Sequence, residues 1–240
     1  MTRRRWIADE VSGDRAALTG EHADHLIRVL RTRVGEQFDV VAGAVIRCGT
    51  VAKISDGRVE FDLTEEILQA AAEETAAKIT LLLAVFKFDR MEWAIEKCTE
   101  LGVARILPVI CQRTEAHLAA ASTKRTERWR RIALQASEQS RRATSPEISD
   151  PLNFADAVRL PAPLRIALLE SERQSLLRDV LPAQSPSEVM LAVGPEGGWT
   201  DSEIQLFQTA CWVAASLGNT ILRAETAAIA ATAIVLSELA

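Results

Sequence analysis

Residues 193–204 read VGPEGGWTDSEI and place a glycine-rich loop between an apolar run, residues 189–193, and a segment that begins like a helix. Thr200 and Glu203 have the spacing of a capping box, in which two side chains satisfy backbone N–H groups of the first helical turn. A buried strand, a glycine turn and a helix in this order are typical of α/β proteins. The stretch therefore predicts an α/β fold.

The second half of the chain alternates apolar strands with helices. Strands are expected at residues 79–86, 105–110, 164–169, 188–193 and 211–217. Helices are expected at residues 89–101 and 123–142, after Thr200 and from about Ala224. This alternation predicts a parallel sheet that is covered by helices on both faces.

The first 70 residues have a different character. Residues 37–63 contain three β-type runs, QFDVVAG, VIRCGTVAKI and RVEFDLTEE, with turn signals between them. A helical pattern, EHADHLIRVLR, precedes these runs, with Leu26, Val29 and Leu30 at helical spacing. We therefore predict a small β domain at residues 1–70, a linker at residues 71–78 and an α/β domain at residues 79–240.

The composition excludes several classes of protein. No stretch approaches the roughly 20 apolar residues that span a bilayer, and the start, MTRRRWIADE, lacks the apolar core of a signal peptide. The four cysteines form no C-x-x-C pair, and His22 and His25 have no further ligands at suitable spacing. We expect a cytoplasmic protein with no membrane segment, no metal and no disulfide framework.

The charges are unevenly distributed along the chain. The net charge is −5, yet residues 112–147 carry eight Lys and Arg against four acids, and residues 1–35 carry seven Arg against five acids. The last 53 residues hold six acids and a single basic residue, Arg223. Two basic surfaces on an otherwise acidic molecule favour an RNA partner. An alternative of equal weight is that these charged residues form helix faces that contact only solvent.

The glycine loop does not match the common phosphate-binding motifs. No Gly-Lys-Ser/Thr follows it, and its glycines do not fit G-x-G-x-x-G. Glu196 adds a negative charge within the loop, which disfavours a phosphate. A loop of this kind suits a neutral or cationic ligand that is bound by backbone groups, although strand–glycine–helix connections also occur without any ligand.

A second segment, SLGNTILRAETAAIAA at residues 216–231, strengthens the prediction of a binding site. It follows another predicted strand and contains Arg223 directly before a helix whose first turn carries Glu225. In parallel sheets, ligands bind at the carboxyl ends of the strands. Two consecutive strand ends with such loops therefore predict a pocket.

These two stretches resemble the SPOUT superfamily of S-adenosylmethionine-dependent RNA methyltransferases. Nearly the whole chain is similar to the ribosomal RNA small-subunit methyltransferase E family, which methylates a uridine of 16S rRNA at ring nitrogen 3. The similarity includes HADHLIRVLR, KFDRMEWAIEKCTELGV, LQASEQSRRATSPEI, GPEGGWTDSEI and LGNTILRAETAAIAA.

The resemblance implies a PUA-like RNA-binding barrel followed by a SPOUT domain with a C-terminal trefoil knot. It also implies a homodimer that binds S-adenosylmethionine between the two loops and acts on 16S rRNA, in our expectation on the assembled 30S subunit. The expected cofactor-binding residues are Leu191, Gly194, Glu196, Gly197, Gly198, Leu217, Gly218, Ile221, Leu222, Arg223 and Thr226.

The chemistry of uracil indicates which side chains the reaction needs. Nitrogen 3 must lose its proton before it attacks a methyl group, so cations near the adjacent carbonyl oxygens would stabilise the anion. Arg142, which the resemblance matches to a family arginine, is the first candidate and Arg223 is the second. Glu196 or Glu225 could act as a base or could instead position an arginine or the ligand. The expected RNA contacts are Arg28, Arg31, Lys87, Arg128 and Arg131. Two other functions stay open: a non-catalytic ribosome-assembly factor, and a methyltransferase acting on tRNA or on ribose 2′-hydroxyls.

Overall fold

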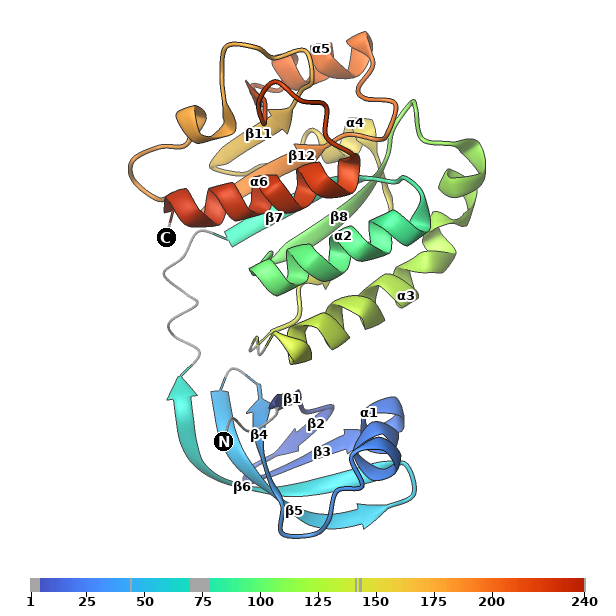
Figure 1. Cartoon of the computed structure of the whole chain (residues 1–240), viewed down its shortest axis with the longest axis vertical. Helices are drawn as coiled ribbons and strands as arrows, with labels where there is room; N and C mark the ends of the chain where they lie inside the picture. Colours follow the sequence, from blue (N-terminus) through green and yellow to red (C-terminus); the bar gives the residue numbers. More distant parts are fainter. Residues whose placement is uncertain (1–4, 44, 70–77, 141, 143, 240) are drawn as a thin grey trace. The chain divides into compact units, whose positions relative to one another are not determined.

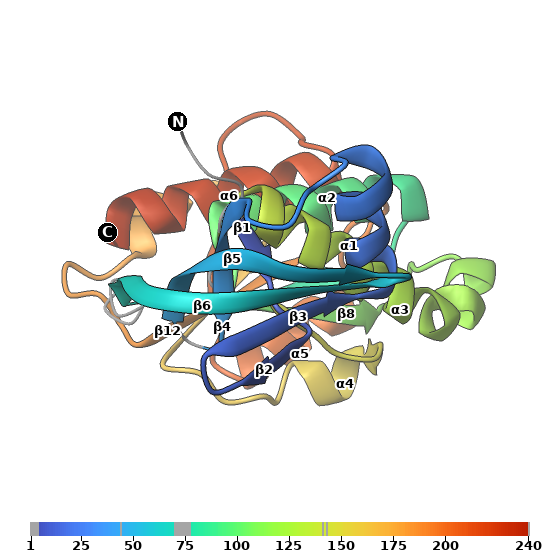
Figure 2. The same ribbon diagram turned by 90° about the horizontal axis from the view of Figure 1, so that it is seen from below.

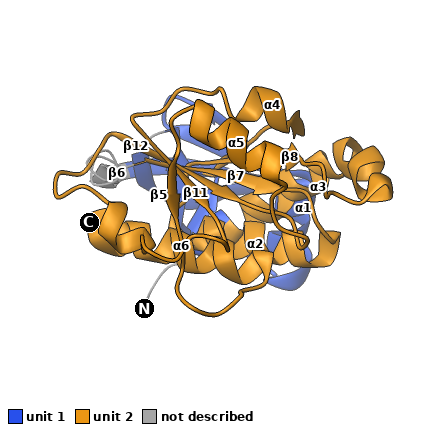
Figure 3. Cartoon of the chain, turned by 90° about the horizontal axis from the view of Figure 1, so that it is seen from above, with its two compact units in different colours: residues 1–75, 137–144 blue, residues 76–136, 145–240 orange. Residues whose placement is uncertain are grey.

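A computed structural model describes residues 5–43, 45–69, 78–140, 142 and 144–239. The chain forms two compact units, the first from residues 1–75 and 137–144 and the second from residues 76–136 and 145–240 (Figure 3). The sequence analysis did not anticipate that residues 137–144 belong with the first unit. Of the predicted linker, residues 71–77 lie outside the described residues, and Lys78 is the first residue of a strand.

The first unit is built on a six-stranded sheet in the order β1-β4-β5-β6-β3-β2. Strands β1 and β4 are parallel and the other neighbours are antiparallel, with the long strands β5 and β6 side by side (Figure 2). The strands are β1 (Arg5–Ile7), β2 (Glu10–Ser12), β3 (Arg15–Thr19), β4 (Gln37–Ala42), β5 (Val45–Ser55) and β6 (Arg58–Gln69). The three predicted strands are confirmed as β4, β5 and β6. Strands β1 to β3 were missed because they are short and β2 is exposed at every residue, so no hydrophobic alternation marks it.

The predicted helix before these strands is present in a modified form. Helix α1 (Gly20–Asp24) continues directly into a π-helical turn, His25–Val29. Leu26 is fully buried in the core of this unit, with Leu18, Phe38 and Phe61. Val29 was expected on the same buried face but is 64% exposed, because a π-helical turn is wider than the α-helical turn assumed in the prediction.

The second unit contains a parallel sheet in the order β10-β8-β7-β12-β11-β13, with β9 also paired to β8 (Figure 1). All of its strand pairs are parallel, as predicted. The strands are β7 (Lys78–Ala84), β8 (Arg105–Ile110), β9 (Glu147–Ile148), β10 (Leu152–Asn153), β11 (Leu164–Leu168), β12 (Glu188–Val193) and β13 (Val213–Ala215).

Helices cover both faces of this sheet. They are α2 (Phe88–Leu101), α3 (Ala116–Gln139), α4 (Phe154–Ala157), α5 (Asp201–Thr209) and α6 (Ala224–Leu239), with a 3-10 turn η3 (Leu177–Val180). Successive strand side chains point to opposite faces, so Leu81 packs with residues of α2 and α6 whereas Leu82 packs with residues of α4 and α5. The two apolar cores explain why the strands read as continuous hydrophobic runs.

The end of α3 differs from the prediction that this helix reaches Arg142. The helix ends at Gln139, and Arg142 lies beyond it. The Arg142 N–H donates to the carbonyl oxygen of Ser137 at 2.9 Å, five residues back instead of the four of an α-helix. The chain therefore leaves the α-helical path before Arg142.

Candidate active site

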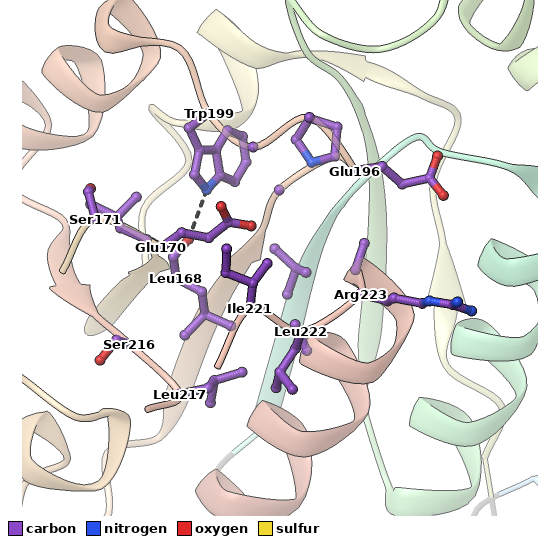
Figure 4. Close-up of a pocket in the computed structure, with 18 of the residues that line it drawn as sticks. Leu168, Glu170, Ser171, Glu196, Trp199, Ser216, Leu217, Ile221, Leu222 and Arg223 are labelled. Atoms are coloured by element: carbon purple, nitrogen blue, oxygen red, sulfur yellow. Dashed lines mark hydrogen bonds between the residues drawn. The ribbon is translucent and has the colours of Figure 1, made fainter. Parts of the chain in front are cut away.

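A cavity of about 670 Å³ lies at the carboxyl ends of three neighbouring parallel strands, β11, β12 and β13 (Figure 4). Its walls come largely from the segments that follow these strands, residues 168–173, 193–199 and 216–224. The volume falls in the range of pockets that enclose a small organic molecule. The site is therefore where strand topology places ligands in parallel sheets.

The glycine loop after β12 is held in place by Trp199. The indole N–H of Trp199 donates to the carbonyl oxygen of Leu168 at 2.9 Å, and its ring packs against Phe154 and Phe207. A Cβ atom on Gly194 would lie 3.0 Å from this ring, so the ring would have to shift by a few tenths of an ångström to admit it. Gly198 has a φ of +70°, a conformation that favours glycine. Trp199 is thus a packing residue that gives the loop its shape.

The capping box predicted after the loop is confirmed. The Thr200 hydroxyl accepts from the Glu203 N–H at 3.3 Å, and the Glu203 carboxylate accepts from the Thr200 N–H at 2.8 Å. Glu203 is 1% exposed, and its second oxygen accepts from the Gln112 N–H at 2.8 Å. A buried carboxylate with this many donors ties the start of α5 to the segment after β8.

Arg113, in that segment after β8, holds the glycine loop through two backbone carbonyl groups. Its guanidinium donates to the carbonyl oxygens of Gly197, at 2.6 Å, and Trp199, at 3.3 Å. Because these two carbonyls are turned toward Arg113, the orientation of the peptide groups in the loop depends on this side chain. Sequence reasoning did not include Arg113 among the site residues.

The wall formed by residues 216–223 carries several apolar side chains of the pocket. Leu217, Ile221 and Leu222 line it, and Ile221 is 76% exposed (Figure 4). Gly218 has a φ of +117°, which allows the turn at the end of β13. The Leu177 N–H donates to the carbonyl oxygen of Ser216 at 2.9 Å, so the start of this wall is fixed to η3.

Charged side chains of both signs line the pocket. The cations are Arg90, Arg113, Arg173 and Arg223, and the acids are Glu170, Glu196 and Asp201. Arg90 donates a hydrogen bond to Glu196, and its Nε atom lies 3.8 Å from an oxygen of Glu225. A site with apolar walls and charges of both signs is suited to a zwitterionic ligand that also carries a flat apolar group.

The RNA methyltransferase domain family matches residues 73–236. A curated ribosomal RNA small subunit methyltransferase E from Synechocystis is 37% identical over 216 residues, which cover 88% of this chain and 69% of the relative. The chain belongs to the ribosomal RNA small-subunit methyltransferase E family.

Two solved structures share this fold over their whole length. A methyltransferase from Legionella pneumophila, in complex with S-adenosylmethionine, has a TM-score of 0.88 at 30% identity, covering 99% of this chain and 98% of its own. A ribosomal RNA small subunit methyltransferase E from Neisseria gonorrhoeae, bound to S-adenosylmethionine, has a TM-score of 0.82 at 28% identity, covering 96% and 95%.

In this family member the pocket brings together most of the predicted cofactor-binding residues. The lining includes Gly194, Glu196, Gly197, Gly198, Leu217, Gly218, Ile221, Leu222 and Arg223. Leu191 and Thr226 do not line it. Leu191 is fully buried between the sheet and its helices, and Thr226 is exposed on the first turn of α6. Arg142 does not line the pocket either and belongs to the first unit.

The third wall, Glu170 to Arg173, was missed by sequence reasoning. The signal was available, because the strand at residues 164–169 was expected and its carboxyl end had to reach the same edge of the parallel sheet. Figure 4 shows the Glu170 carboxylate inside the pocket between Trp199 and Ile221. The acid therefore adds a negative charge on the side opposite to Arg223.

The predicted RNA contacts lie in different environments. Arg28 is exposed and 3.6 Å from Asp24, Arg31 is exposed with a φ of +53°, and Lys87 is exposed before the first turn of α2. Arg131 is exposed on α3. Arg128 instead donates two hydrogen bonds, of 2.7 and 2.9 Å, to the carboxylate of Glu92 on α2. These bonds raise the pKa of Arg128, and its guanidinium is already paired with a carboxylate within the fold.

In the part of the chain that the structure describes, no group of three or more His, Cys, Asp or Glu side chains could hold a metal ion. Burial raises the pKa of the Cys98 thiol to about 12 and also raises that of Cys111, which keeps both thiols protonated. None of the described helices is long and apolar enough to cross a bilayer.

Proposed function

We propose that this protein transfers the methyl group of S-adenosylmethionine to ring nitrogen 3 of a uridine in 16S rRNA, on the assembled 30S subunit in the cytoplasm. The observation that carries the proposal is the pocket at the ends of β11, β12 and β13, with its glycine loop and its Leu217–Arg223 wall. Relatives of similar sequence and fold bind S-adenosylmethionine.

The residues present fit this cofactor. Gly194, Gly197 and Gly198 place loop backbone in the lining of the pocket, and the wall with Ile221 and Leu222 offers apolar contact for an adenine ring. Glu170 supplies a carboxylate for the ammonium group or for the ribose hydroxyls. When bound, S-adenosylmethionine supplies a methyl group that its positively charged sulfur makes electrophilic.

The chain's own side chains prepare the uracil. Arg142 is proposed to stabilise the anion that forms when nitrogen 3 loses its proton, because a guanidinium offers paired donors to adjacent carbonyl oxygens. Arg223, in the pocket wall, is the second candidate for this role. Glu196 would act as the base or would position an arginine, and its hydrogen bond with Arg90 favours the positioning role.

The first unit is proposed to be a PUA-like RNA-binding domain, and Arg28, Arg31, Lys87, Arg128 and Arg131 are proposed to meet RNA phosphates. A homodimer whose active sites take residues from both chains would let Arg142 of one chain serve the pocket of its partner. The trefoil knot is supported by the course of the chain: β13 lies at the sheet edge, yet α6, which follows it, packs against β7 and β12.

The test is methyl transfer from labelled S-adenosylmethionine to 30S subunits that lack the modification, followed by nucleoside mapping. We expect label in 3-methyluridine of 16S rRNA and none on 30S subunits that already carry the mark. Label in tRNA or on ribose 2′-hydroxyls would replace the proposal with the second alternative. Binding to 30S subunits without transfer would replace it with a non-catalytic assembly factor.

A further inference from the structure

Arg90 lies in the first turn of α2, far in sequence from both loops that form the pocket, yet it lines the pocket. Its Nη1 atom donates a hydrogen bond to Glu196, in the glycine loop. Its Nε atom lies 3.8 Å from an oxygen of Glu225, in the first turn of α6. One guanidinium thus contacts an acid from each of the two segments that follow β12 and β13.

The positive charge of Arg90 stabilises the two nearby carboxylates, Glu196 and Glu225. Glu225 is 4% exposed, and among the described residues its second oxygen has no hydrogen-bond partner. A buried carboxylate without a nearby positive charge is strongly unfavourable, and two carboxylates near one guanidinium would repel each other if it were removed. Arg90 is itself only 31% exposed in its side chain, so water screens these interactions incompletely.

The geometry points to Arg90 as a positioning residue that fixes the glycine loop against the start of α6 and so keeps the cofactor site in its binding shape. This inference rests on the proposed function and adds to it a residue outside both loops. The effect runs through Glu196 and Glu225. Arg90 is bonded to Glu196, and Arg113 is bonded to the carbonyl oxygen of Gly197, so two arginines hold the same loop at neighbouring residues.

A double-mutant cycle separates positioning from direct ligand contact. The variants are Arg90→Gln, Glu196→Gln and the double variant, with Arg90→Lys as the conservative change. S-adenosylmethionine affinity is measured by calorimetry. For Arg90→Gln we expect roughly a tenfold loss of affinity, the size of one charge-assisted hydrogen bond, and a smaller loss for Arg90→Lys. In the Glu196→Gln background, removal of Arg90 should cost clearly less than in the wild type, because its partner is already neutral.

Lys97→Gln is the matched control, since Lys97 lies on the same helix, bonds to Glu96 and Glu100 and does not line the pocket. Its affinity should equal that of the wild type. Steady-state kinetics give a second readout: Arg90→Gln should raise KM for S-adenosylmethionine and leave KM for the 30S subunit unchanged. Equal losses in both backgrounds would mean that Arg90 contacts the ligand directly and would overturn the inference.

Unchanged affinity in Arg90→Gln would overturn the inference as well. Failure of the wild type to bind S-adenosylmethionine would instead refute the proposed function, so the two failures are distinguishable. Melting temperatures of all variants accompany the titrations. If Arg90→Gln does not fold, the comparison of Arg90→Lys with the wild type, alone and with Glu196→Gln, decides the same question.

Discussion

The side chain of Arg113 occupies the space that a side chain on Gly197 would need. A Cβ atom on Gly197 would lie 3.3 Å from Cδ and 3.4 Å from Cβ of Arg113, while the Arg113 guanidinium holds the Gly197 carbonyl oxygen at 2.6 Å. The glycine at this position therefore serves the contact between the loop and the segment after β8. The missing side chain leaves room for Arg113, which also lines the pocket.

Gly197→Val should weaken S-adenosylmethionine binding because the added methyl groups displace Arg113 and release the loop carbonyls. We expect roughly a tenfold or greater loss of affinity by calorimetry, as for one lost charge-assisted hydrogen bond. Arg113→Ala alone should give a similar loss, and the double variant should be little worse than either. Additive losses would show that Gly197 and Arg113 act separately, and wild-type affinity in Gly197→Val would remove the loop from the site.

Arg142→Lys tests the proposed role of Arg142 in chemistry. Lysine keeps the charge but loses the paired donors, so the rate of methyl transfer should fall roughly tenfold to a thousandfold, as for one oriented transition-state donor. S-adenosylmethionine affinity should change little. Single-turnover kinetics at saturating 30S subunits and S-adenosylmethionine measure this rate. Unchanged rates in both Arg142→Lys and Arg142→Ala would move the role to Arg223.

RNA binding should depend on salt and on the exposed arginines of the first unit. Arg28→Gln and Arg31→Gln should each weaken binding to 30S subunits and lower the slope of log affinity against log salt by about 1 per lost phosphate contact. Arg178→Gln, which removes an exposed cation of the second unit, serves as the control. Affinity that stays flat between low and physiological salt would mean that these arginines are merely solvated.

Charge reversal at Arg128 is a less direct test of RNA binding than the sequence indicated. Arg128→Glu would place a second carboxylate against Glu92, whose side chain is 14% exposed, and would lower the melting temperature as well as RNA affinity. The double reversal Arg128→Glu with Glu92→Arg should recover the melting temperature. Arg131→Glu, on the same helix, is compared with the wild type in melting temperature, in S-adenosylmethionine affinity and in RNA affinity.

Glu138 predicts a pH dependence of stability. Burial raises the pKa of its carboxyl above the ordinary value of 4.5. The attraction of His22, whose Nε2 atom lies 3.6 Å from Oε1 of Glu138, lowers this pKa and so partly offsets the effect of burial. Because the folded state then binds the proton more tightly, this group stabilises the fold below about pH 4.5, and the contribution is lost as pH rises through the folded pKa. Glutamine resembles the protonated form.

Glu138→Gln should therefore melt above the wild type at pH 7, and the difference should shrink as the pH falls to 4. Thermal unfolding followed by circular dichroism at both pH values provides the measurement. Glu36→Gln, an exposed acid of the same unit, should change nothing at either pH. A lower melting temperature of Glu138→Gln at pH 7 would show that the attraction to His22 exceeds the cost of burial.

Local sequence determined the features that depend on residues close to one another in the chain. The capping box of Thr200 and Glu203, the continuous apolar runs of β7, β8, β11 and β12, and the left-handed glycine Gly198 follow from residue chemistry within a few positions. Such signals also indicated the pocket, since parallel strands bring their carboxyl ends to one edge. They could not mark β2, which is exposed at every residue, or the end of α3, which a bond from Arg142 to Ser137 decides.

Only the tertiary structure decided which distant residues meet in the site. Arg90 meets Glu196 across 106 positions of sequence and Arg113 meets Gly197 across 84, and no periodicity or motif in either segment encodes these pairs. The same folding pairs Arg128 with Glu92, so a residue assigned to RNA by charge alone also serves the fold. Charge and spacing report what a side chain can do, whereas its partner depends on how strands and helices pack, and that packing is a property of the whole chain.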